Sequence, residues 1–70
     1  MANRVMLGIQ GVENSEQMEI IVNALSKQQG VLEAEIQQIG QVAVEYDPHR
    51  LTVMDLIRTV REEGFLAGML

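Results

Sequence analysis

The side chains of this chain best suited to chemistry lie in one short segment, Glu13-Asn14-Ser15-Glu16-Gln17. Their carboxylate and amide oxygens are ligands that Mg²⁺, Ca²⁺ or Mn²⁺ accept. Carboxylates three residues apart are, however, also typical of a solvated helix face, and no neighbouring group completes the six or more ligands that calcium prefers. A hard-metal site at Glu13, Glu16 and Gln17 is therefore an alternative, not the main interpretation.

Other reactive groups are scarce. The chain has no cysteine, which excludes thiolate metal sites and disulfide bonds. The one histidine, His49, follows the third predicted strand, and we expect it in a turn at a different end of the domain from Glu13. The sequence shows no Ser-His-Asp or Cys-His set and no glycine-rich phosphate loop. We expect neither enzymatic activity nor a cofactor.

Length and charge restrict the class of protein. Seventy residues make a single small domain, residues 1–70, near the lower limit for an unaided hydrophobic core. A net charge of −5 repels phosphate backbones, so we expect no nucleic-acid partner. No apolar run approaches the roughly 20 residues of a membrane span, and no signal segment opens the chain. We therefore expect no membrane insertion and a cytoplasmic location.

Hydrophobic periodicity predicts the order strand, helix, strand, strand, helix, strand. Alternating apolar residues mark strands at 4–10, 31–37, 41–46 and 65–70. Apolar residues at helical spacing mark two helices, one from Ser15 to a stop at Gly30 and one from Thr52 to a stop at Gly64. Both apolar helix stripes are buried at once if they lie on the same face of one sheet. We predict an α+β fold, a ferredoxin-like βαββαβ sandwich with a four-stranded antiparallel sheet and two helices on one face.

The start of each predicted helix carries residues that can cap it. Asn14 is a favoured N-cap, and Gln17 lies three residues later, where its side chain can reach back to the cap. Thr52 and Asp55 form an acidic variant of the same capping box. The oxygens of Asn14 and Gln17 therefore have a structural role available to them without any metal.

These elements resemble the heavy-metal-associated domain family, which includes copper chaperones and the N-terminal domains of metal-pumping ATPases. The resemblance covers nearly the whole chain, and its combination of segments is more specific than any one of them. The matching segments are Leu7-Gly8-Ile9-Gln10-Gly11, Gly30-Val31, Gly40-Gln41-Val42-Ala43-Val44-Glu45-Tyr46-Asp47-Pro48, and Leu56-Ile57 with Glu63-Gly64-Phe65.

The resemblance implies a metal loop, which in the family reads Gly-Met-Thr-Cys-x-x-Cys. In this chain Gly11 matches the glycine, and Val12 and Glu13 replace the methionine and threonine. Asn14 and Gln17 stand at the positions of the two cysteines. Because an amide oxygen is a poor ligand for a soft ion such as Cu(I), the resemblance implies a degenerate member without the metal-binding thiolates.

Two surfaces are predicted to contact a partner. Beside the loop, Phe65 is expected to cover the start of the first helix and, with Val12, to leave a small apolar patch rimmed by Glu13 and Glu16. On the open face of the sheet, strand parity turns apolar residues away from the helices, next to an acidic region. The apolar residues are Met6, Ala43, Leu66 and Leu70, and the acidic ones are Glu33, Glu35 and Glu45.

We therefore predict a non-enzymatic interaction or regulatory module with a protein partner, either a metal-transport component or a second copy of the chain. Two alternatives stay open. One is a metal-trafficking domain, of a metallochaperone or a transporter N-terminus, that binds metal through oxygen, His49 or partner-supplied ligands. The other is a ferredoxin-like regulatory domain that senses a small molecule.

Overall fold

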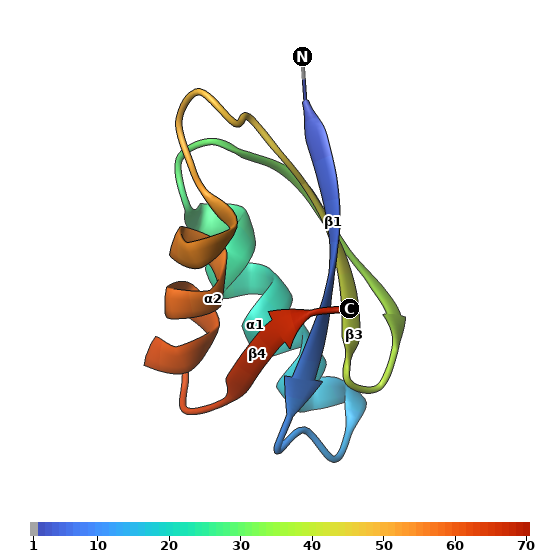
Figure 1. Cartoon of the computed structure of the whole chain (residues 1–70). Helices are drawn as coiled ribbons and strands as arrows, with labels where there is room; N and C mark the ends of the chain where they lie inside the picture. The colour runs from blue at the N-terminus through green and yellow to red at the C-terminus, as the bar shows by residue number, and fades with distance from the viewer. Residues whose placement is uncertain (1) are drawn as a thin grey trace.

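Two helices lie against one face of a single four-stranded sheet (Figure 1). The structure is a computed structural model that describes residues 2–70, and Met1 lies outside the described residues. The elements are β1 (Asn3–Gln10), α1 (Ser15–Lys27), β2 (Val31–Gln38), β3 (Gln41–Tyr46), α2 (Val53–Glu62) and β4 (Leu66–Met69). The strands are ordered β2-β3-β1-β4, and each neighbouring pair is antiparallel. The predicted ferredoxin-like sandwich is confirmed.

The core lies between the sheet and the helices and is almost wholly aliphatic. Inward residues of β1 and β3 meet the apolar stripes of α1 and α2, as the two periodicities predict. The largest fully buried side chains are Leu7, Met18, Ile21, Leu25, Val42, Val44, Leu56 and Val60. No helix within residues 2–70 is long and apolar enough to span a membrane.

Both ends of α2 are closed by local hydrogen bonds, as predicted. The Thr52 N–H donates to Asp55 Oδ2 at 2.9 Å, and the Asp55 N–H donates to Thr52 Oγ1 at 3.3 Å. The bond from the Thr52 backbone holds the pKa of the Asp55 carboxyl below its usual value. At the other end the Gly64 N–H donates to the Arg61 carbonyl at 2.9 Å. The φ of Gly64, 94°, turns the chain so that the Phe65 N–H donates to the Val60 carbonyl at 3.4 Å.

The prediction that Gly30 stops the first helix was wrong. Helix α1 ends at Lys27, with Gln28 as its C-cap. Gly30 lies in the turn that follows, closed by a 3.1 Å bond from the Val31 N–H to the Gln28 carbonyl. A Cβ at Gly30 would lie 2.9 Å from Leu51 Cγ, and its φ is 101°. Glycine is therefore required by the turn and by the close approach of Leu51, not by the helix end.

The strand register fixes which side chains meet on the open face. Glu33 of β2 lies directly opposite Glu45 of β3, and Arg4 of β1 lies on the other side of Glu45. Arg4 Nη1 is 3.9 Å from Glu45 Oε1. Glu35 opposes the uncharged Ala43. The carboxylates of Glu33 and Glu45 therefore face each other across neighbouring strands, and Arg4 is the arginine beside them.

Replacing Glu33 by Lys is expected to raise the free energy of unfolding by about 0.5 kcal/mol, because it converts a directly opposed like-charge pair into an opposite-charge pair. Glu35→Lys changes the net charge equally on the same strand and face but opposes Ala43, so we expect a smaller gain. Urea denaturation of both variants at low salt measures the difference. Equal gains would show that overall charge, not the register, sets the effect.

Candidate functional site

The segment between β1 and α1 is a tight loop covered by an aromatic ring. Gly11 has a φ of 92°, and a Cβ there would lie 3.6 Å from Phe65 Cδ1. Val12 and Phe65 are both half-buried and pack against the core. Phe65 reaches this position because Gly64 turns the chain at the end of α2. The structure thus brings Phe65 next to the loop, whereas Glu13 and Glu16 remain exposed at its rim.

Asn14 and Gln17 close the start of α1 through their amide oxygens. Asn14 is the N-cap, and its Oδ1 accepts from the Gln17 N–H at 2.9 Å. The Gln17 Oε1 accepts from the Glu13 N–H at 2.6 Å. We expected the Gln17 side chain to reach the N-cap, and it instead reaches one residue further back. Each amide therefore satisfies one backbone donor, and the two bonds interlock.

This geometry leaves the loop poorly equipped to hold a metal ion. A cation would have to compete with the Glu13 and Gln17 N–H groups for the amide oxygens, and the remaining amide NH₂ groups are donors only. Within residues 2–70, no three His, Cys, Asp or Glu side chains are grouped in a way that could hold a metal. His49 lies in the turn after β3, where its N–H donates to Asp47 Oδ1 at 2.9 Å. That turn and the β1–α1 loop lie at opposite ends of the molecule (Figure 1).

The open face of the sheet carries most of the second predicted surface. Leu66 and Leu70 are 59% and 70% exposed, and Met6 is half-buried. Ala43 points away from the helices as predicted, since it is not part of the core cluster, but it is only 2% exposed. Its short side chain lies in a central strand between Met6 and Glu35, whose longer side chains shield it. Ala43 therefore offers almost no contact surface, and its inclusion was wrong.

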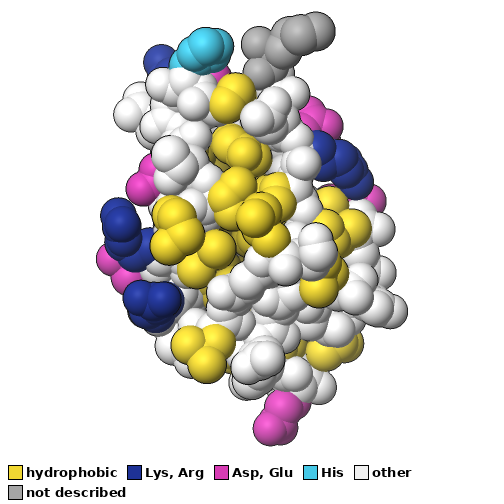
Figure 2. Space-filling view, in the orientation of Figure 1, with side chains coloured by type: hydrophobic (Ala, Val, Ile, Leu, Met, Phe, Trp, Pro, Cys, Tyr) yellow, Lys and Arg dark blue, Asp and Glu magenta, His cyan; other side chains and the backbone are white. Residues whose placement is uncertain are grey.

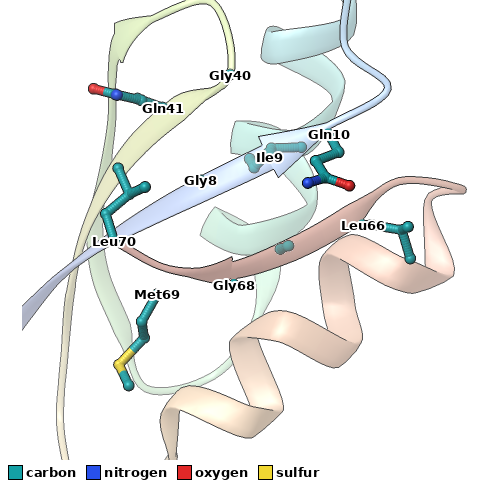
Figure 3. Close-up of a pocket in the computed structure, with 10 residues that line it drawn as sticks. Gly8, Ile9, Gln10, Gly40, Gln41, Leu66, Gly68, Met69 and Leu70 are labelled. Atoms are coloured by element: carbon teal, nitrogen blue, oxygen red, sulfur yellow. The ribbon is translucent and has the colours of Figure 1, made fainter.

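Sequence reasoning missed a hollow on this face. Gly8 of β1 and Gly68 of β4 lie directly opposite each other, so neither strand places a side chain there. The resulting cavity has a volume of about 450 Å³. Leu70 and Gln41 lie at one end of it, and Gln10 and Leu66 at the other (Figure 3). The glycines were visible in the sequence, but their pairing depends on the register of two strands at opposite ends of the chain.

Comparison with known proteins finds solved structures with the same fold but no protein that is recognisably similar in sequence. No family model matches the sequence, and no curated protein is detectably similar to it. Among solved structures, a copper binding domain from HMA7, a P-type ATPase, has a TM-score of 0.90 at 23% identity, covering 100% of this chain and 95% of that chain. Oxidized MerP from Ralstonia metallidurans CH34 has a TM-score of 0.91 at 21% identity, covering 99% and 97%.

A third similar structure is the N-terminal domain of a potential copper-translocating P-type ATPase from Bacillus subtilis, solved in its Cu(I)-loaded state. Its TM-score is 0.89 at 27% identity, and the alignment covers 99% of this chain and 88% of that domain. The resemblance to heavy-metal-associated domains is therefore confirmed at the level of the fold. This chain differs in having no cysteine.

Replacing Asn14 by Ala is expected to lower the free energy of unfolding by about 1 kcal/mol, because the Gln17 N–H loses its acceptor at the start of α1. Asn14→Ser keeps a capping oxygen and should cost much less. Thermal and urea denaturation of the two variants against the wild type give the comparison. Equal losses in both would mean that the cap does not hold this loop.

Proposed function

We propose that this chain is a non-enzymatic interaction or regulatory module that keeps the heavy-metal-associated scaffold without its metal chemistry. The observation that carries the proposal is the interlocked pair of amides, with Asn14 capping α1 and Gln17 holding the Glu13 N–H. The positions that supply thiolates in the family serve the backbone here. Residues 1–70 act as one unit in this proposal, and the cytoplasm is its expected location.

The surface beside the loop supports contact with a protein. Val12 and Phe65 form a half-buried apolar patch on the outside of the core, and the exposed Glu13 and Glu16 rim it. A patch of this kind, with apolar residues in the middle and charges around them, has the composition of a small transient interface. A component of a metal-transport system is the partner that the fold favours, and a second copy is the alternative.

A metal-trafficking domain is the competing function, and the fold itself favours it, since similar solved structures include copper-binding domains. It requires ligands other than cysteine, from Glu13, Glu16, His49 or a partner. Glu13 and Glu16 lie at the loop, but His49 is at the opposite end of the molecule. Titration of the wild-type chain with Cu(I), Zn²⁺ and Mn²⁺ separates the two functions, because the interaction module should bind each no better than any acidic surface does.

The Asn14→Cys/Gln17→Cys double variant should gain Cu(I) binding, because the scaffold would then present two thiolates across the helix start. A matched control is Asn23→Cys/Ser26→Cys, which places two cysteines at the same spacing on an exposed part of α1. We expect the loop variant to bind Cu(I) about 100-fold or more tightly than the control, since the loop can bring both thiolates to one ion. Competition against a chromogenic Cu(I) chelator measures both.

Two results would contradict this account. Tight Cu(I) binding by the wild-type chain would show that the loop keeps its metal chemistry without cysteine. Equal affinities of the two double variants would show that the loop geometry is not that of a metal loop. Because cysteine caps helices poorly, the apo loop variant should also be less stable than the wild type, and Cu(I) should restore the loss.

A further inference from the structure

The hollow over Gly8 and Gly68 has a backbone floor and apolar ends. Leu70 leans over Gly8, since a Cβ on Gly8 would lie 2.7 Å from Leu70 Cδ2. The other half is empty, because a Cβ on Gly68 would meet nothing within 4 Å. Leu66 and Leu70 remain 59% and 70% exposed on this face. One half of the hollow is thus covered by a leucine of the chain itself, and the half over Gly68 has room for an apolar side chain from elsewhere.

Three carboxylates lie on the same face, toward β2. Glu33 and Glu45 are directly opposed, Glu35 follows on the same side of β2, and Arg4 at 3.9 Å from Glu45 is the one cation that contacts them in the described chain. The side chains of Arg4 and Glu45 are 55% and 39% exposed, so this ion pair is solvated and weak. Like charges opposed across a strand pair repel each other, and a further cation would relieve that repulsion.

The distance between these two features suits an extended peptide. Glu35 lies three strands and two residues away from Gly68 in the sheet, through the pairs Gly68–Gly8, Gly8–Gln41 and Ala43–Glu35. With strands about 4.8 Å apart and a rise of about 3.3 Å per residue, the separation is about 16 Å. An extended chain covers that distance in about five residues. Apolar contact and cation contact can therefore come from one short segment.

We infer that the open face of the sheet binds an extended, basic–apolar segment of another protein. One apolar side chain of that segment rests over Gly68 between Leu66 and Leu70, and lysine or arginine residues about five positions away contact Glu33, Glu35 and Glu45. The inference rests on the proposed interaction function and names the chemistry of its partner. It also uses a different surface from the patch of Val12 and Phe65 beside the β1–α1 loop.

The charge of the face selects this partner over others. A second copy stacked face to face brings three further carboxylates and one arginine, so it adds more negative charge to the contact than it neutralises. Nucleic acid and anionic lipid are repelled by the same carboxylates and by the net charge of −5. Figure 2 shows exposed hydrophobic side chains beside acidic and basic ones along the β1 side of the molecule. A basic–apolar segment complements both parts of the face at once.

The test uses the whole chain and a synthetic peptide, acetyl-Leu-Ser-Val-Ser-Lys-Ser-Lys-amide, whose alternate residues place Leu, Val and both Lys on one side. Titration of the ¹⁵N-labelled chain should give saturable shifts at Gly8, Gly68, Glu33 and Glu35, weakening as salt rises. A peptide with Glu in place of both Lys should not bind. No saturable binding, or shifts confined to Glu13, Glu16 and Glu19, would overturn the inference. Shifts on concentrating the chain alone would indicate a second copy and would also overturn it.

Two variants separate the parts of the contact. A Cβ at Gly68 meets nothing within 4 Å and the residue has no positive φ, so we expect Gly68→Val to fill the empty half of the hollow and to weaken peptide binding about tenfold. Glu33→Lys/Glu35→Lys should also weaken binding about tenfold. The control Glu19→Lys/Glu62→Lys makes the same charge change on the exposed sides of α1 and α2 and should cost less than about twofold.

Each variant is first checked for a native ¹⁵N spectrum. Unchanged peptide affinity in a folded Gly68→Val chain would overturn the proposed apolar contact over Gly68. Equal losses of peptide affinity in both charge variants would overturn the proposed contact with Glu33 and Glu35. Failure of peptide binding leaves the proposed function standing, because that function fails on a different result, tight Cu(I) binding by the wild-type chain.

Discussion

The first turn of α1 is held by two hydrogen bonds in which amide side chains accept from backbone N–H groups. Gln17 Oε1 accepts from the Glu13 N–H, and Asn14 Oδ1 accepts from the Gln17 N–H. Gln17 therefore takes part in both bonds, in one through its side chain and in the other through its backbone. The first N–H groups of a helix have no partner within the helix, and Asn14 supplies one for the Gln17 N–H. The bond to Gln17 Oε1 serves the Glu13 N–H, which lies just before the helix. The same two positions carry thiolates in the family that this chain resembles. In this structure the side-chain oxygens at both positions accept backbone hydrogen bonds at the helix start.

The loop is also tied to the rest of the fold. Met18, one residue into α1 from Gln17, is fully buried, and its sulfur accepts from the Gly40 N–H at 3.3 Å. The Gly40 carbonyl accepts from the Ile9 N–H at 2.7 Å, next to the end of β1. The start of α1, the β2–β3 turn and the end of β1 are thus joined beside the loop. These bonds hold the loop in place from three sides of the fold.

Features set by residues close in sequence were predictable, and features set by packing were not. The six elements follow from apolar periodicity, and the Thr52–Asp55 box follows from spacing alone. Gly30 was misassigned because the need for glycine there comes from Leu51, a residue of the segment after β3 that packs against Gly30 only in the folded chain. The shielding of Ala43 and the pairing of Gly8 with Gly68 depend on strand register, which periodicity does not fix. The absence of cysteine is visible in the sequence, and the capping role of Asn14 follows from its place before the first helix.

The central claim is that the amides of Asn14 and Gln17 are engaged by the backbone in the free protein, and amide hydrogen exchange tests it most directly. Glu13 and Gln17 donate to side-chain oxygens, whereas Ser15 and Glu16 occupy first-turn positions that these two bonds do not serve. The account predicts that the Glu13 and Gln17 amide protons exchange about tenfold or more slowly than those of Ser15 and Glu16, after correction for intrinsic rates. Equally fast exchange at all four positions would contradict it, because the loop oxygens would then be free to bind a metal ion.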